Sequence, residues 1–553
     1  MAGRPAAARP PAPPGGRPVS GALLIGGTTS DAGKSVVVAG ICRWLRRRGM
    51  RVAPFKAQNM SLNAAVTADG REIGRAQAAQ AAAAGVPPEA AMNPVLVKPT
   101  SALGAQVVVM GQPLTDVDAR SYRDLGASLM PTVLGALEEL RARFDAVVCE
   151  GAGGIAEINL RASDIANMGL ARAAALPVVV VGDIDRGGVF ASAFGSLALL
   201  DPGDQALVRG FVVNKFRGDM SLLRPGIAEL ERRTGRSVLG VLPWVAGLEV
   251  DAEDSLALDA PRPAPLPPAG RDRLVVAVVR FPRLSNFTDF DPLCAEPGVE
   301  VLFTEWPQAL SRADLAVLPG TKATVADLAW LRSRGIDRVL EERARLGRPV
   351  LGICGGYQML GRRVVDDVEC RAPSEAPAGP SRKLAERTGS AVAGLGLLPV
   401  ECVFEPDKVL ACPSGVAPGF GGAPVSGYEI HHGRVRRLGG DPLFVGVGGG
   451  PMDPEGCRAG EVLGTSWHGV FEGDSFRRAF LAWVAAGRGL HWTPGDRPFA
   501  EVREGRLDRL GDLVEEHLDH SALLDLLREG PRAGLPTLVT GLSPGGAGAE
   551  RAV

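Results

Sequence analysis

Short apolar runs alternate with longer amphipathic segments along the first half of the chain. The runs cover residues 22–25, 146–149, 177–181 and 211–213, and each is separated from the next by enough residues for at least one helix. Runs that are apolar at every position are typical of parallel strands buried between two layers of helices. The pattern predicts a doubly wound α/β domain over residues 20–255.

The same pattern starts again after a proline-rich stretch. Five prolines fall between residues 261 and 268, and this density disfavours helix and favours a stiff extended linker, which we place at residues 256–272. Apolar runs at 274–279, 315–318 and 349–354 follow. They predict a second doubly wound α/β domain over residues 273–500.

The remaining segments are not expected to carry chemistry. Residues 1–19 are rich in Pro, Ala and Arg and predict a disordered extension, residues 371–393 an exposed insertion, and residues 531–553 a tail. Between these last two, within a C-terminal segment at 501–530, the apolar residues from Arg506 to Glu529 recur at helical spacing. We expect one helix there that packs against a domain.

Composition narrows the classes of protein to consider. The formal net charge of the 553 residues is −1, so no overall basic field would attract nucleic acid. No stretch offers the ~20 apolar residues of a membrane span.

The eight cysteines are scattered without a C-x-x-C pair, which favours reduced thiols in a cytoplasmic protein. His517 and His520 could share a helix face, but acidic neighbours favour a solvated surface over a metal site. Nothing indicates the oligomeric state.

A glycine-rich loop follows the first apolar run. The sequence Gly-Gly-Thr-Thr-Ser-Asp-Ala-Gly-Lys-Ser spans residues 26–35, and a helix-like stretch follows it. In this order, glycines turn backbone N–H groups toward phosphates, Lys34 reaches the outer phosphates and the Ser35 hydroxyl can ligate Mg²⁺. Although glycine-rich chains can contain Gly-Lys-Ser by chance, the strand and helix on either side favour an ATP site. The predicted nucleotide-binding residues are Gly27, Thr28, Asp31, Gly33, Lys34, Ser35 and Asn214.

Acidic and amide residues end the other predicted strands. Glu150 ends the run at 146–149, where a carboxylate could hold Mg²⁺ together with Ser35; an ordinary strand end would look the same. Asp183 and Asp185 are further acidic candidates. Asn214 could present its amide to adenine, or it could be a turn residue.

A cysteine stands at a second strand–turn–helix junction. Gly-Ile-Cys-Gly-Gly-Tyr-Gln at 352–358 has the layout of a nucleophile elbow. A helix N-terminus favours negative charge on the sulfur of Cys354, and the Gly355 N–H can donate to the oxyanion formed when the sulfur attacks the amide of glutamine. Gly320, at the end of an earlier strand, could supply the second donor.

Such a cysteine needs a base, and the chain has only six histidines. His468 ends another apolar run and is the predicted proton shuttle. His431 and His432 are the alternatives, with roles in binding substrate or in structure. Most cysteines are simply buried, but the elbow together with a strand-end histidine favours catalysis.

Four further motifs accompany the two sites, at residues 54–63, 183–190, 214–219 and 427–431. With them, residues 20–530 resemble the cobyric acid synthase family, the glutamine-hydrolysing enzymes of cobalamin biosynthesis. The phosphate loop, one residue longer between Gly27 and Gly33 than the common form, resembles that of the dethiobiotin synthetase group. The second domain resembles class I glutamine amidotransferases, with a flavodoxin-like fold.

The resemblance implies an ATP-, Mg²⁺- and L-glutamine-dependent ligase. Its substrate would be a small-molecule corrinoid, adenosylcobyrinic acid a,c-diamide, amidated at its b, d, e and g carboxylates. It implies catalytic roles for Cys354 and His468. The motifs add predicted substrate-binding residues, which are Lys56, Gln58, Asn59, Asp183 and His431.

The chain departs from the amidotransferase pattern at one position. Most members of that class have a glutamate two residues after the histidine, where this chain has Val470. Glu472 lies four residues after the histidine and is given no catalytic role. What orients His468 is therefore left open by the sequence.

Two other functions compete with this interpretation. A sister enzyme amidates the a and c carboxylates of cobyrinic acid with the same two chemistries, but it resembles residues 55–63 and 183–190 less well. A nucleotide-switched partitioning or regulatory protein would need only the first domain. An intact Cys354 and His468 argue against that alternative.

Overall fold

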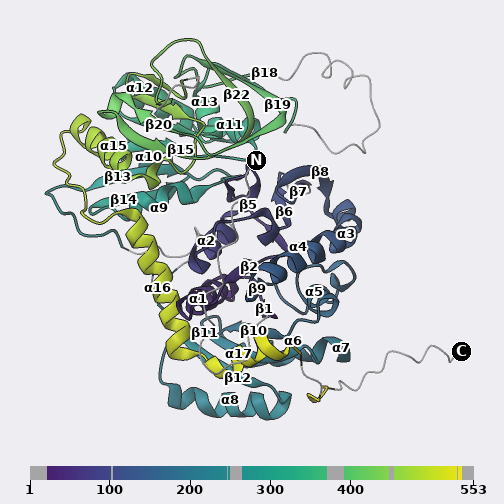
Figure 1. The fold of residues 1–553 in the computed structure, drawn as a ribbon. Helices are drawn as coiled ribbons and strands as arrows, with labels where there is room; N and C mark the ends of the chain where they lie inside the picture. The colour runs from purple at the N-terminus through teal and green to yellow at the C-terminus, as the bar shows by residue number, and fades with distance from the viewer. Residues whose placement is uncertain are drawn as a thin grey trace, which may run out of the picture.

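The computed structural model describes residues 21–100, 104–245, 247–248, 264–369, 391–446, 454–531 and 534–538. The predicted extension, residues 256–263 of the predicted linker, most of the predicted insertion and most of the tail fall outside these residues. The described residues form two lobes, each built on a six-stranded sheet (Figure 1). The two doubly wound α/β domains predicted from the apolar runs are confirmed.

The sheet of the N-terminal lobe is parallel throughout. Its strand order is β12-β11-β10-β1-β9-β2, so β1 and its following loop lie at the centre. The strands are β1 (Gly21–Gly27), β2 (Val52–Phe55), β9 (Ala146–Glu150), β10 (Val178–Asp183), β11 (Val208–Phe216) and β12 (Ser237–Pro243).

Helices cover both faces of this sheet, because successive side chains of each strand point to opposite sides. Leu23 and Ile25 of β1 face one cluster of buried residues, and Ala22 and Leu24 face another. On the first side pack α1 (Lys34–Arg47), α16 (Phe499–His517) and α17 (His520–Glu529); on the second pack α4 (Met130–Arg143), α5 (Met168–Ala173) and α6 (Val189–Ala198). The lobe also contains α3 (Ala119–Ser128), α7 (Pro202–Gln205) and α8 (Met220–Thr234).

The N-terminal lobe is the lower lobe in Figure 1, and the C-terminal lobe is the upper lobe. A smaller assembly lies between the sheet of the lower lobe and the upper lobe (Figure 1). It consists of the sheet β3-β6-β7-β8, the hairpin β4–β5 and helix α2. Their bounds are β3 (Gln58–Met60), β4 (Ala64–Val66), β5 (Glu72–Gly74), α2 (Arg75–Ala84), β6 (Val95–Pro99), β7 (Gly104–Val109) and β8 (Gln112–Asp118). The motif at residues 54–63 therefore runs from the end of β2 into this assembly.

The C-terminal lobe has the strand order β14-β13-β15-β16-β25-β24, with only β24 antiparallel. The strands are β13 (Leu274–Val279), β14 (Val299–Thr304), β15 (Leu315–Leu318), β16 (Val350–Ile353), β24 (Cys457–Ala459) and β25 (Val462–Thr465). The helices are α9 (Asp291–Cys294) and α15 (Asp474–Gly487) on one face, and α10 (Pro307–Arg312), α11 (Thr324–Ser333), α12 (Ile336–Arg345) and α13 (Gly355–Leu360) on the other.

Two further sheets flank this lobe, β18-β17-β19-β22 and β21-β20-β23. The longest of their strands, β19 (Val400–Ala411) and β22 (Glu429–Arg437), pair with each other. The shorter ones are β17 (Arg363–Val365), β18 (Ala391–Ala393), β20 (Ser414–Ala417), β21 (Ala423–Ser426) and β23 (Val445–Gly446). The last three residues of the predicted insertion thus form an edge strand.

The C-terminal segment forms two helices where the sequence predicted one. Leu518 is extended between α16 and α17, and it bridges to Gly240 at the sheet edge. The Asp519 side chain accepts a hydrogen bond from the backbone N–H of Ala522 and caps α17. Apolar spacing continues across this break because both helices pack on the same core, so periodicity alone does not reveal it.

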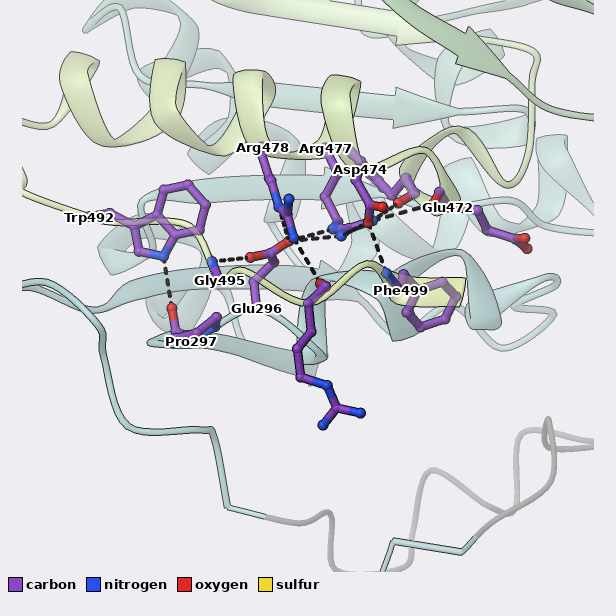
Figure 2. A network of polar contacts seen from close by, with 11 residues as sticks. Glu296, Pro297, Glu472, Asp474, Arg477, Arg478, Trp492, Gly495 and Phe499 are labelled. Carbon is purple, nitrogen blue, oxygen red and sulfur yellow. Dashed lines mark hydrogen bonds and ion pairs between the residues drawn. The ribbon is translucent and has the colours of Figure 1, made fainter. Parts of the chain in front are cut away.

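A network of buried polar contacts fixes the chain where it leaves the upper lobe for α16 (Figure 2). The Glu296 carboxylate accepts from Arg477 Nε at 2.9 Å and from the Gly495 N–H at 2.8 Å. Asp474 accepts from the N–H of Phe499, the first residue of α16. The helix then runs down the side of the lower lobe (Figure 1), so the last helices of the chain tie the two lobes together.

The lobes also share a buried contact around the β4–β5 hairpin. Ala64 and Leu96 of the lower lobe pack with Tyr428 and Ile430 of the upper lobe. Beside them Glu72, which is fully buried, accepts from Lys98 Nζ of its own lobe and Lys408 Nζ of the other, both at 2.5 Å. A buried charge paired across a boundary makes separation of the two lobes costly.

Candidate active sites

Cys354 occupies a tight turn between β16 and α13. Its backbone has φ 50° and ψ −109°, a conformation that costs a non-glycine residue free energy and that marks many functional sites. The Cys354 N–H donates to the Thr465 carbonyl on β25, and the side chain is 6% exposed. The neighbouring strand therefore holds the thiol at the head of a helix, where the predicted elbow places it.

His468 lies against this cysteine and is held by a residue that the sequence analysis missed. Its Nδ1 is 2.7 Å from Oδ2 of Asp289, and Oδ1 of the same carboxylate accepts from the Gly469 N–H at 2.8 Å. Asp289 belongs to the 3-10 helix Phe287–Phe290 and is 4% exposed. The carboxylate fixes the ring so that Nε2 is free to exchange a proton with a substrate or nucleophile.

The charges around His468 favour its protonated form. Burial lowers its pKa, but the Asp289 carboxylate and Cys354, through charge and hydrogen bonds, raise it, and the net pKa is about 10. The Tyr428 ring stacks on the imidazole with centroids 5.4 Å apart. A buried cysteine beside a held imidazolium can react as a thiolate.

The two glycines predicted as oxyanion donors lie beside Cys354 and His468. Gly355 is the first residue of α13, and the first N–H groups of a helix have no acceptor within it. A β-carbon at Gly320 would lie 2.8 Å from His468 Cε1 and 3.1 Å from Ser285 Oγ. Only glycine therefore lets the backbone at position 320 approach the imidazole this closely.

The pocket that contains Cys354 is lined by both lobes. Asn286, Gln358 and His431 come from the upper lobe, and Leu62 and Lys98 from the lower lobe. His431 Nε2 is 3.4 Å from Glu429 Oε1, and its Nδ1 has no partner among the described residues. His431 therefore lines the pocket of the cysteine site and does not lie at the phosphate loop. His432 lines the same pocket and bonds the Glu405 carbonyl.

Glu472 takes part in the contact between lobes. It accepts from Arg75 of α2 at 2.6 Å and from Arg503 of α16 at 3.2 Å. Since Asp289 already occupies the Nδ1 side of His468, Glu472 has no orienting role at the ring.

The glycine-rich loop closes over its own lysine. Lys34 Nζ donates to the carbonyls of Thr29 and Gly153, both at 3.0 Å. Phosphate oxygens of a bound nucleotide would compete with these two carbonyls for the hydrogen bonds of the lysine. Gly33 has φ 96°, which a side chain would strain. Thr28 donates its N–H to the Val181 carbonyl, which fixes the start of the loop on β10.

Glu150 lies at the centre of a buried polar cluster at the end of β9. Its Oε1 accepts from Ser35 Oγ at 2.8 Å and Lys56 Nζ at 2.9 Å, and its Oε2 accepts from Gln80 Nε2 at 2.5 Å. Burial raises the pKa of this carboxyl, but Lys56 and the other donors lower it overall, so the group is ionised. An ionised carboxylate beside a hydroxyl fits Mg²⁺, which takes one or two such oxygens and completes its shell with phosphates and water.

The other predicted residues of this site serve the loop or its rim. The Asn214 amide donates to the Ala32 carbonyl at 2.9 Å, so it contacts the phosphate loop directly. Asp183 accepts from Lys215 Nζ at 2.7 Å, and Lys215 also donates to the carbonyl of Asp31. This arrangement joins the ends of β10 and β11 to the loop.

The predicted substrate-binding residues lie in separate places. Lys56 and Asn59 are 2% and 1% exposed, so they can meet only a group that enters the buried site beside Glu150. Gln58 is half-buried at the start of β3. Asp183 lies at the loop and His431 at the cysteine pocket, and the structure does not bring all five together.

Comparison with known proteins supports both halves. Residues 23–257 match the CobQ/CobB/MinD/ParA nucleotide binding domain, and residues 275–476 match the CobB/CobQ-like glutamine amidotransferase domain. The cobyric acid synthase of Frankia casuarinae is 56% identical over 545 residues, 95% of this chain and 100% of that protein. The chain belongs to the cobyric acid synthase family. The cobyric acid synthase of Saccharopolyspora erythraea is 57% identical, over 96% of this chain and 98% of its own. The family resemblance predicted from the motifs is confirmed.

Membership of the cobyric acid synthase family makes this chain an ATP-dependent, glutamine-hydrolysing ligase with a nucleotide-binding half and an amidotransferase half. Among solved structures, one described as glutamine amidotransferase is 17% identical and covers 39% of this chain and 99% of its own, with a TM-score of 0.28. None of the described helices is long and apolar enough to cross a membrane.

Proposed function

We propose that this chain amidates the b, d, e and g carboxylates of adenosylcobyrinic acid a,c-diamide, with ATP and glutamine, to give adenosylcobyric acid. The observation that carries the proposal is full-length identity of 56% to a cobyric acid synthase in a chain that keeps both centres. The functional units would be residues 20–255 for carboxylate activation and 273–500 for glutamine hydrolysis. We place the enzyme in the cytoplasm and expect no nucleic-acid partner.

In the glutaminase half, the thiolate of Cys354 attacks the side-chain amide carbon of glutamine. The N–H groups of Gly355 and Gly320 receive the negative charge on the amide oxygen. His468, held by Asp289, gives its proton to the departing nitrogen, so that ammonia leaves and a thioester remains. Water then hydrolyses the thioester, with His468 as general base, and releases glutamate.

In the activating half, a corrinoid carboxylate oxygen attacks the γ-phosphorus of ATP, and ADP leaves. Lys34 and the backbone of the loop hold the phosphates, while Ser35 and Glu150 would hold Mg²⁺, which neutralises charge on the transferred group. Ammonia then attacks the carbonyl carbon of the acyl phosphate. The C–N bond forms, a proton is lost and inorganic phosphate leaves.

We propose that buried amide side chains near Glu150 line part of the route that ammonia takes from the glutaminase centre. Gln80 contacts Glu150, and Gln77 on the same helix face accepts from Asn59 Nδ2 at 2.7 Å. Asn59 Oδ1, Gln77 Nε2 and Gln80 Oε1 are buried and have no partner among the described residues. Such groups are costly unless a small polar molecule satisfies them, and ammonia can both donate and accept. We assign them to its passage.

The substrate proposal is tested with purified corrinoids. The protein is incubated with ATP, Mg²⁺ and glutamine, and products are resolved by mass. Four amidations of the a,c-diamide and none of cobyrinic acid support the proposal. Amidation of cobyrinic acid at two positions, with an inert a,c-diamide, would instead identify the sister activity.

A further inference from the structure

We propose that Asn63, from the nucleotide-binding half, is a positioning residue of the glutaminase centre, because with Asn286 it clasps the loop whose Asp289 orients His468. The inference rests on the proposed function only in that glutamine hydrolysis is the reaction affected.

The clasp is a reciprocal pair of hydrogen bonds across the lobe boundary. Asn63 Oδ1 accepts from the Phe287 N–H at 3.3 Å, and Asn286 Oδ1 accepts from the Ala64 N–H at 2.9 Å. Asn63 and Asn286 are 1% and 2% exposed. Loss of either hydrogen bond would leave a buried polar group without a partner, which costs free energy. The pair therefore fixes the backbone on both sides of the lobe boundary.

In the upper lobe, the loop that contains Asn286 continues to Asp289, which bonds the imidazole of His468. Residues 285–289 connect the Ser285 N–H, which donates to the Gly320 carbonyl, to the carboxylate that bonds His468 and the Gly469 N–H. Asn286 has φ 52°, a left-handed conformation that asparagine adopts more readily than most residues. A shift of this loop would move the proposed oxyanion glycine and the imidazole together.

In the lower lobe, the segment that ends at Asn63 begins at the phosphate site. Lys56 bonds Glu150, and the chain then passes Asn59 and Leu62 to reach Asn63. The Asn63 carbonyl accepts from the N–H of Arg75, whose side chain pairs with Glu472 just beyond His468. The nucleotide-binding half therefore contacts the other half at two places close to His468 in the chain, and the Asn63–Asn286 contact is the one that leads to Asp289.

Position 286 permits a matched pair of variants in the full chain. Asn286→Gly keeps the left-handed backbone and removes the side-chain acceptor, whereas Asn286→Asp keeps an oxygen at the same place. We expect Asn286→Gly and Asn63→Ala to lower kcat for glutamine hydrolysis at least about tenfold. Asn286→Asp should recover most of that loss, and amidation supported by ammonium salts should stay within about twofold of the parent, since the phosphate site is not altered.

A second readout separates positioning from simple docking. Iodoacetamide alkylates Cys354, and the mass of the peptide that contains it gives the rate. The pH dependence of this rate reports how the thiol and the imidazole of His468 share their proton. We expect the profile of Asn286→Gly to move and that of Asn286→Asp to stay. An unchanged profile and hydrolysis rate for Asn286→Gly would overturn the inference, as would equal losses with glutamine and with ammonium. Hydrolysis is measured without corrinoid, so a failure of the substrate proposal would not be mistaken for either result.

Discussion

The carboxylate of Asp289 and the imidazole of His468 are 179 residues apart in sequence and 2.7 Å apart in the fold. This contact takes the place of the glutamate that most class I amidotransferases have two residues after the histidine. It explains how the centre can be oriented although Val470 stands at that position. The acid has moved to a different strand connection, while the imidazole still meets a carboxylate at Nδ1.

Asp289→Asn should impair glutamine hydrolysis and leave ammonia-supported amidation intact. The amide preserves the shape but removes the charge that stabilises the imidazolium, and it permits the wrong tautomer. We expect kcat/KM for glutamine to fall by about 10²- to 10⁴-fold. Steady-state release of glutamate measures this directly. A variant as active as the parent would show that the contact does not serve catalysis.

The pH dependence of hydrolysis should change in the same variant. Because the pKa of His468 is raised to about 10, the parent should keep its imidazolium, and so its activity, up to about that pH. Removing the carboxylate removes the larger of the two charges that raise this pKa, so the alkaline limb of kcat/KM should move to lower pH. The same interaction stabilises the fold below the unfolded pKa of about 6.5 and is lost as pH rises through the folded value. An alkaline limb at the same pH in both proteins would contradict this assignment.

Cys354→Ala should abolish the use of glutamine while ammonium salts still support amidation. The sulfur is the only proposed nucleophile of the hydrolysis, and it lies in the lobe that does not bind phosphate. Amide formation from each nitrogen source, assayed by mass of the corrinoid, tests the division. Loss of both activities would mean that the two halves do not function separately.

Lys34→Ala should remove amidation with either nitrogen source. Without its ammonium group the loop cannot hold the outer phosphates, so the carboxylate is not activated. We expect at least about a 100-fold loss of ADP formation, with Cys354 alkylation by iodoacetamide unchanged as a control for folding. An enzyme still active with ammonium would exclude Lys34 from the phosphate site.

Gln77→Leu should uncouple the two reactions. Leucine is close in size but cannot bond ammonia, and it leaves Asn59 facing an apolar group. We expect glutamine hydrolysis to continue while the number of amides formed per glutamate released falls severalfold, and external ammonium to restore amidation. Gln112→Leu, on the exposed strand β8, is the matched control and should remain coupled. A coupled Gln77→Leu enzyme would exclude this passage.

Local patterns in the sequence determined both folds and the position of each centre. Apolar runs of strand length can be buried only between helix layers, and residues 274–279 and 315–318 form strands with the predicted bounds. The glycine loop and the cysteine elbow were equally visible, because each is a strand, a tight turn and a helix contiguous in the chain. Such motifs depend on neighbouring residues and so can be recognised before the chain is folded.

Only the tertiary structure decided how these pieces act on one another. The sequence did not reveal that Asp289 contacts His468. An aspartate in a short connection belongs to no repeating pattern, and its partner lies far along the chain. The hydrogen bond from the Asn214 amide to the Ala32 carbonyl could not be predicted either, because the two residues lie on segments far apart in the chain. Likewise, the Asn63–Asn286 clasp exists only because the two lobes dock with these loops in contact. A sequence specifies local geometry through adjacent residues, but hydrogen bonds between distant segments depend on the register and docking that the whole core determines.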